Sequence, residues 1–250
     1  SGNRHFAEAA KTLTTDDLEF TQSSIFTKTY DGDTACTTAT VQIKDSAKVT
    51  SGDELPTVTG TYAYNSKDVN SASKVTFTST ESSSTNYILP ANLTVEQNAS
   101  ITPADQAELT IASAATTPYG TDLTLTVSGG SGNGAVTYTV ANGTGKATVS
   151  GSTLHPVQAG TVTVVATKAG DNDYNDVTSA PFVLMIKPAT PTGEPKYTKI
   201  TTSGKTLADA GLTTTGSTLN PNAGTLVWVD NAGNVLHGTT AVAANTTYKW

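Results

Sequence analysis

The chain has 250 residues, of which 14% are charged and 36% hydrophobic, and its formal net charge is −7. This acidic balance, without any basic cluster, disfavours nucleic acid and anionic membranes as partners, because both require Lys and Arg to neutralise phosphate. No apolar run approaches the roughly 20 residues that a membrane-spanning helix needs, so we expect no membrane insertion.

The N-terminal residues contain little that predicts a strand. The stretch 6–13 favours helix locally, but so short a segment does not hold a helix in water unless it docks. We therefore expect residues 1–17 to be an N-terminal tail.

From residue 18 onward, short segments alternate apolar and polar residues, which is typical of strands with one face toward a core. In a first module, residues 18–104, the predicted strands are 18–20, 39–43, 74–78 and 93–95.

A middle module, residues 105–193, continues this pattern. Its predicted strands are 108–111, 122–127, 135–140, 146–149, 160–165 and 181–186. Glycines at 129–134 supply the positive φ values that tight turns require. Closely spaced strands and turn signals are typical of an immunoglobulin-like sandwich. The predicted fold class is all-β, with tandem immunoglobulin-like β-sandwich modules joined by short Pro-containing linkers.

An internal repeat supports this division. Tyr87 and Tyr174 are 87 residues apart (174 − 87), and Pro103 and Pro188, which follow them, are 85 apart (188 − 103). Each proline ends a strand, because proline cannot continue the hydrogen-bond ladder. The predicted boundaries fall near 104 and 193, and the second coincides with the Pro-rich segment 190–195.

The third stretch, residues 194–250, is shorter than one repeat. We predict a strand at 226–229, a turn at 230–233 and a returning strand at 234–236. The stretch is expected to be either a module interrupted within a strand or a smaller, different module.

The sequence offers little catalytic chemistry. His5, His155 and His237 stand alone, without a partner at metal-binding spacing, and we expect the last two in turns or on the surface. No Gly-x-Ser-x-Gly motif occurs, and the glycines at 129–134 fit neither the Walker nor the dinucleotide-binding spacing. We expect no catalytic residues, no cofactor and no enzyme activity.

Residues 171–176 gather carboxylates and amides in one segment. Asp171, Asp173, Asn175 and Asp176 present hard oxygen ligands that could hold calcium, although the segment lacks the glycine and glutamate of an EF-hand loop. The alternative is a solvated turn in which Tyr174 packs on the sandwich.

Exposed aromatic rings are the other candidate site. Sugar binding by a sandwich would use rings such as Tyr62, Tyr64, Tyr119, Trp228 and Trp250, and we single out Trp228 and Tyr119 as ligand residues. Most of these rings are expected in the core. Exposed rings in a cluster would favour a binding role, whereas their burial would favour a spacer.

Cross-links are scarce. The single cysteine, Cys36, excludes an intramolecular disulfide and a cysteine-based zinc site, and we expect it to be a small buried side chain. Lys28 and Asn86 have the side-chain types of an isopeptide bond, but the sequence identifies no buried acid to promote it.

Three motifs carry a resemblance. Tyr30-Asp31-Gly32 opens the first module, Gly52-Asp53 lies in its middle, and Asn86-Tyr87 precedes its last strand. In this order they resemble the YDG and MBG family of bacterial surface repeats over about residues 20–104. The middle module resembles bacterial immunoglobulin-like repeats, and the third stretch is similar to further repeats in large cell-wall proteins of Firmicutes.

The resemblance implies a function without catalysis. The implied role is a spacer or stalk, a monomeric segment of a longer secreted or cell-surface protein of a Gram-positive bacterium, either adhesin-like or part of a multidomain extracellular enzyme. Asp31-Gly32 would form a turn that Tyr30 anchors to the core. The alternative is a carbohydrate-binding or host-adhesion module that binds glycans or a host surface protein through exposed Tyr and Trp.

Overall fold

The structure is a computed structural model, and it describes residues 9–45, 49–222 and 224–250. The described residues are all-β, with short strands and the 3₁₀ helices η1 (Thr15–Asp17) and η2 (Leu207–Ala210). Among them, no helix has the length and hydropathy needed to span a bilayer. The described chain divides into two compact units, the first made of residues up to 110 with 128–137 and 166–179, the second of 111–127, 138–165 and 180–250.

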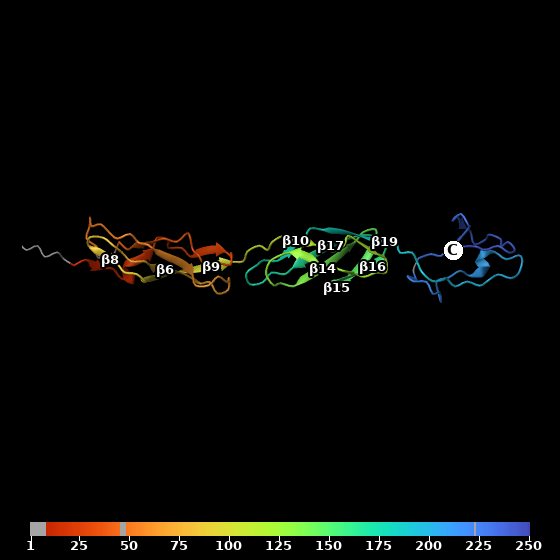
Figure 1. Cartoon of the computed structure of the whole chain (residues 1–250), viewed down its shortest axis with the longest axis horizontal. Helices are drawn as coiled ribbons and strands as arrows, with labels where there is room; N and C mark the ends of the chain where they lie inside the picture. The colour runs from red at the N-terminus through yellow and green to blue at the C-terminus, as the bar shows by residue number, and fades with distance from the viewer. Residues whose placement is uncertain (1–8, 46–48, 223) are drawn as a thin grey trace, which may run out of the picture. The chain divides into compact units, whose positions relative to one another are not determined.

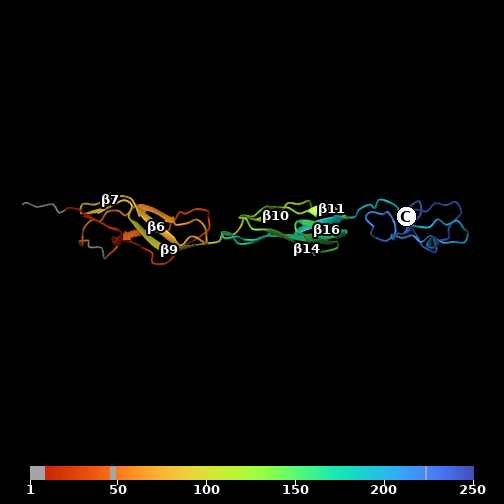
Figure 2. The same ribbon diagram turned by 90° about the horizontal axis from the view of Figure 1, so that it is seen from below.

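The first module is built from short strands that follow the alternating pattern. They are β1 (Lys11–Thr12), β2 (Leu18–Phe20), β3 (Phe26–Thr29), β4 (Val41–Ile43), β5 (Gly60–Tyr64), β6 (Lys74–Ser79), β7 (Ser82–Ser83), β8 (Tyr87–Leu89) and β9 (Thr94–Thr102). Its largest sheet has the order β3-β9-β6-β5, in which β9 pairs in parallel with β3 and antiparallel with β6. Figures 1 and 2 both show β6 beside β9.

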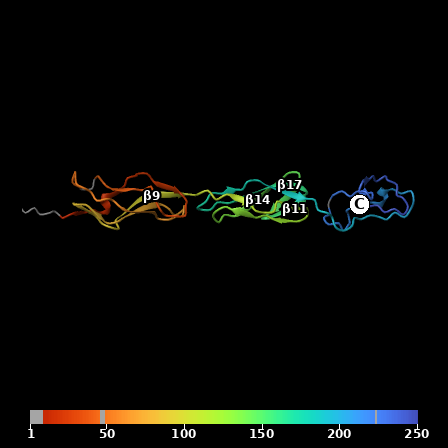
Figure 3. The same ribbon diagram turned by 45° about the horizontal axis from the view of Figure 1, so that its top comes forward.

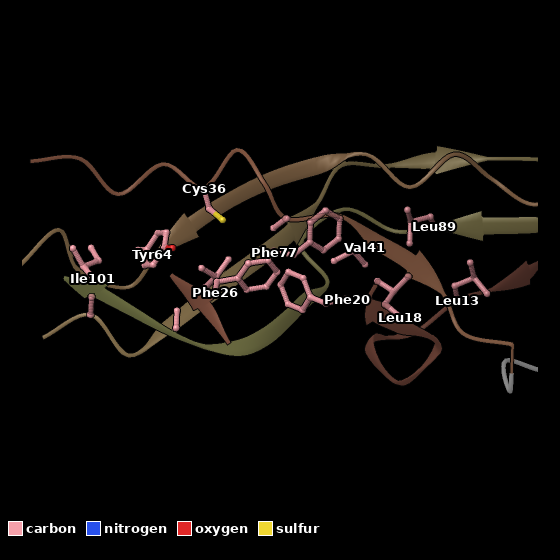
Figure 4. Packing of buried hydrophobic residues seen from close by; sticks show 14 of the residues in the cluster. Leu13, Leu18, Phe20, Phe26, Cys36, Val41, Tyr64, Phe77, Leu89 and Ile101 are labelled. Atoms are coloured by element: carbon pink, nitrogen blue, oxygen red, sulfur yellow. The ribbon is translucent and has the colours of Figure 1, made fainter. Parts of the chain in front are cut away.

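The core of the first module lies on the inward face of these strands. Along β6, Val75, Phe77 and Ser79 are buried and alternate with more exposed residues, as period two requires. Phe20, Phe26 and Phe77 occupy the middle of this core (Figure 4). The rings of Phe20 and Phe26 meet edge to face, with centroids 5.3 Å apart.

The structure corrects the expected N-terminal tail, because residues 11–17 form β1 and η1 and bury Leu13. Strand β1 pairs in parallel with β8, and Leu13 is only 1% exposed at the margin of the phenylalanine core (Figure 4). At the start of η1, the Asp17 carboxylate accepts the backbone amide and the hydroxyl of Thr14, each at 2.9 Å. Leu13 is a lone apolar residue without alternating neighbours, so period two gave no signal there. The predicted helical tendency at 6–13 lies partly outside the described residues, and residues 11–12 are strand.

The middle module contains the next group of strands. They are β10 (Leu109–Ile111), β11 (Thr116–Pro118), β12 (Leu123–Thr124), β13 (Val127–Gly129), β14 (Val136–Asn142), β15 (Lys146–Ser150), β16 (Thr153–Gln158), β17 (Gly160–Lys168), β18 (Val177–Thr178) and β19 (Phe182–Lys187). They form the sheets β11-β19-β17-β14, with β18 on β17, β12-β16-β15 and β10-β13. Figure 3 shows β11, β14 and β17 together. Buried aliphatic residues, among them Leu154, Val164 and Leu184, form the core.

The two modules share a sheet order. In β3-β9-β6-β5 and in β11-β19-β17-β14, an early strand of the module, β3 or β11, pairs in parallel with its last strand, β9 or β19. The last strand then pairs antiparallel with a long strand, β6 or β17. The largest sheets of the two modules therefore have the same pattern of strand pairing.

The third stretch contains less regular structure. Strands β20 (Trp228–Val229) and β21 (Val235–Leu236) pair antiparallel, within the two predicted segments. The turn between them is held by Asp230, whose Oδ1 accepts the amides of Ala232 and Asn234 at 2.9 and 2.8 Å. Helix η2 buries Leu207 and Ala210.

Candidate functional site

The Tyr30-Asp31-Gly32 motif forms a turn directly after β3. The Lys28 Nζ donates to Asp31 Oδ1 at 2.7 Å and to the Asp33 carbonyl at 2.7 Å, and it lies 5.1 Å from the centre of the Tyr64 ring. The hydrogen bond from Lys28 lowers the pKa of Asp31 below its usual value. Gly32 has φ +78°, a conformation that glycine adopts readily. Lys28 therefore organises the turn.

The Tyr30 ring contacts both the core of its own module and the ring of Tyr174. Its half-buried ring packs against the core of its own module, as expected, and its backbone amide donates to the Thr102 carbonyl at 2.8 Å. In addition, its ring meets the ring of Tyr174, with centroids 5.2 Å apart and planes at 76°. The sequence pattern gave no sign of this contact, because the two residues are 144 positions apart.

The acidic segment 171–176 uses its oxygens for internal hydrogen bonds. Asp171 Oδ1 accepts the amides of Asp173 and Tyr174 at 3.0 Å each, and its Oδ2 accepts the amide of Asn133 at 2.8 Å. Asp173 Oδ1 accepts the amide of Val69 at 2.8 Å.

The other two calcium candidates lie apart from these hydrogen bonds. Asn175 donates from Nδ2 to Asp105 at 2.9 Å, and Asp176 is exposed. Within the described ranges, no three His, Cys, Asp or Glu side chains converge in a way that could hold a metal ion. The oxygens proposed for calcium thus serve different partners, and the arrangement fits an ordered turn.

We predict that acid loosens this turn through Asp171. The amide of Asn133, followed by those of Asp173 and Tyr174, lowers the pKa of Asp171 below 3.8. A carboxylate with a lowered pKa stabilises the fold above pH 3.8, and this contribution is lost as the pH falls through the lower folded pKa. In an NMR titration, the Asn133 amide signal should move with a midpoint below 3.8, and the movement should vanish in Asp171→Asn. A midpoint at or above 3.8 would contradict the assignment.

The third stretch holds an aromatic pocket, defined as the cavity of about 640 Å³ beside β20. Trp228 lies in it and meets Tyr197 edge to face, with ring centroids 5.8 Å apart. Tyr197 is 50% and Trp250 39% exposed. The lining also includes Tyr248, Lys199 and Lys249. Flat rings beside polar groups are the typical composition of a small-molecule or sugar site.

The remaining aromatic candidates are mostly part of the two sandwich cores. Tyr64 is buried, and Tyr62 packs on Phe77 while its hydroxyl accepts the amide of Val41 at 3.0 Å. Tyr119 packs against the core of the middle module and also lines a smaller cavity of about 370 Å³. The structure therefore does not bring Tyr119 and Trp228 into one site.

Of the two alternatives expected for His155, a turn or the surface, the structure has the surface. His155 lies in β16 with a 42% exposed side chain, and its Nδ1 is 2.9 Å from Asp122 Oδ1, a pairing that the sequence did not indicate. His237 is exposed, with Nδ1 2.9 Å from the Thr239 hydroxyl. His5 lies outside the described residues.

Cys36 and the pair Lys28 and Asn86 were the residues considered for cross-links. Cys36 is buried, which confirms the expectation. Lys28 directs its Nζ to Asp31 and to the carbonyls of Asp33 and Ala35, so its hydrogen bonds serve the turn after β3 rather than Asn86.

Comparison with known proteins identifies one domain. Residues 14–95 match the YDG domain family. The comparison with curated proteins gave no match. Among solved structures, the crystal structure of murine CEACAM1b is similar at 14% identity, with a TM-score of 0.22, over 48% of this chain and 60% of that chain. The alignment thus spans about 60% of the length of that protein. A YDG domain is therefore present at residues 14–95.

Proposed function

We propose, with the YDG domain at residues 14–95 as the premise, that the chain is a non-catalytic spacer or stalk segment. The whole protein to which it belongs is proposed to be secreted or displayed on the cell wall of a Gram-positive bacterium, as the family resemblance of the sequence implies. We propose no enzyme activity for this segment, and a role in adhesion or beside a catalytic domain would come from other parts of that protein.

The observation that carries this proposal is that tyrosine hydroxyls in the first two modules form hydrogen bonds with groups of their own module. Tyr87 is 3% exposed, and its hydroxyl donates to Asp53 at 2.9 Å and accepts the amide of Thr50 at 2.8 Å. The Tyr138 hydroxyl donates to the carbonyl of Leu125 at 3.2 Å. Groups that satisfy one another in this way rigidify a fold and leave little for a ligand.

Two measurements on the purified chain test the spacer proposal. A compact globule of this length has a radius of gyration of about 18 Å, so a spacer should give a clearly larger value in small-angle scattering. The same sample should show no saturable binding to a panel of polysaccharides and glycans. A compact particle would contradict the proposal, and so would a saturable hit.

The second candidate function is glycan or host-protein binding, and the aromatic pocket around Trp228 is the observation that favours it. If the panel gives a hit, Trp228→Ala should weaken it at least tenfold, because the ring forms part of the pocket wall. Tyr119→Ala is the matched control, since Tyr119 lines a different cavity. Loss of binding in the Trp228 variant alone would replace the spacer proposal. Equal binding in both variants would remove the pocket as the site.

A further inference from the structure

The segment 171–175 belongs to the middle module by sequence, yet it lies in the same compact unit as the YDG domain. The Val69 amide of the YDG domain donates to Asp173 Oδ1 at 2.8 Å. The Asp173 side chain thus contacts the backbone of the YDG domain directly. A charged acceptor makes it stronger than a bond between neutral groups.

The same segment also binds the residues that connect the two modules. Ala104 pairs with Tyr174 in a parallel bridge, in which the Ala104 amide donates to the Asp173 carbonyl at 2.9 Å and the Asn175 amide donates to the Ala104 carbonyl at 2.8 Å. The Asn175 side chain adds its hydrogen bond to Asp105. Because Ala104 and Asp105 are both hydrogen-bonded to the segment 171–175, the connection between the two modules has little freedom to bend.

An aromatic contact completes the arrangement. The edge-to-face pair of Tyr30 and Tyr174 joins the motif turn of the YDG domain to the segment 171–175. Both rings are half-buried. Such a pair contributes beyond the area it buries, because the edge of one ring carries the opposite partial charge to the face of the other.

Each of the two tyrosines stands on a turn that has its own hydrogen bonds. Tyr30 stands on the turn that Lys28 and Asp31 organise. Tyr174 stands on the turn that the Asp171 carboxylate closes, and Gly132, with φ +66°, lies against that carboxylate. Preorganised partners lose little conformational freedom when they dock.

We propose that the Tyr-Asp-Gly turn is a docking face for the following module, and that the connection at 104–105 is a fixed joint. The face consists of the Tyr30 ring and the Val69 amide, and its partner is a loop carrying Asp-Tyr, here Asp173-Tyr174. The motif that defines the domain thus serves contact with its neighbour as well as its own turn. This inference does not rest on the spacer proposal, since the joint would exist in a glycan-binding chain too.

Hydrogen exchange of the Val69 amide in the full chain tests the joint. Asp173→Ala removes the acceptor, and Val69 should then exchange roughly tenfold to hundredfold faster, the range expected for a lost bond to a charged group. Asp176→Ala is the matched control, because it removes an exposed carboxylate from the same segment and should leave Val69 unchanged. Unchanged Val69 exchange in Asp173→Ala would overturn the proposal.

The ring contact supplies a second test that does not depend on Asp173. Tyr30→Leu and Tyr174→Leu should each accelerate Val69 exchange. Because both variants remove the same ring contact, the double variant should accelerate exchange by less than the product of the two single fold-changes. The Phe77 amide reports the fold of the YDG domain itself and should stay protected. Full additivity, or loss of Phe77 protection without a specific effect on Val69, would overturn the joint. A glycan hit would remove the spacer proposal and leave these exchange rates as predicted.

Discussion

Replacing Phe77 by alanine is expected to lower the free energy of unfolding of the YDG domain by about 3–5 kcal/mol, the usual cost of deleting a buried phenylalanine ring. Phe77 has no exposed surface, and its ring centroid is 5.0 Å from that of Tyr62. The backbone of Gly60 approaches the same ring so closely that a Cβ there would overlap it. Because the site is tightly packed on several sides, little of the resulting cavity can close.

Urea unfolding followed by the NMR amide signals of β6 measures this loss for the YDG domain alone. Ile25→Ala is the matched control, since Ile25 is an aliphatic residue of the same module that is 57% exposed. Its cost should stay within about 0.5 kcal/mol, as for most surface substitutions. Similar costs for the two variants would mean that the packing around Phe77 is not as described.

The second large effect is expected at Gly129, the last residue of β13. Gly129 has φ +85°, and a Cβ there would overlap the Glu108 carbonyl oxygen. Gly129→Ala therefore combines backbone strain with a collision that only a backbone shift can relieve. We expect a loss of about 4 kcal/mol or more, in the range of the most damaging single substitutions.

Gly151→Ala separates these two contributions. Gly151 also has positive φ, +58°, but nothing lies within 4 Å of a Cβ placed there. Its cost should be the strain alone, about 1–2 kcal/mol. Thermal unfolding of both variants gives the comparison. If Gly129→Ala costs no more than Gly151→Ala, the close approach to Glu108 is wrong.

The sequence predicted the strands whose burial alternates strictly. The segments 74–78 and 160–165 coincide with β6 and β17, because their apolar side chains fall on one face. Strands without such a pattern were missed. Strand β5 contains Gly60 and Ala63 and has Tyr64 as its buried residue, and β16 is interrupted by Pro156, so neither offers a clean period-two signal.

The candidate sites depended on contacts that no local pattern encodes. Trp228 was predicted as a ligand residue, and its place in the aromatic pocket depends on Tyr197 and Trp250, which approach it through folding. Tyr30 was expected on its own core, but the neighbouring Tyr174 comes from a different module by sequence. Periodicity identifies which face of a strand is buried; it carries no information on which distant loop covers a turn.

The parallel pairing of β3 with β9 and of β11 with β19 has a mechanical consequence. Phe26 to Thr29 pair in register with Ala99 to Thr102, and Thr116 to Pro118 pair with Met185 to Lys187. Tension that reaches the start of β3 or β11 and leaves at the end of β9 or β19 pulls the two hydrogen-bonded strands past each other. The bonds between parallel strands are evenly spaced and slanted, so under this pull several of them share the load and must break together. We therefore expect the β3–β9 and β11–β19 pairs to resist stretching of their modules.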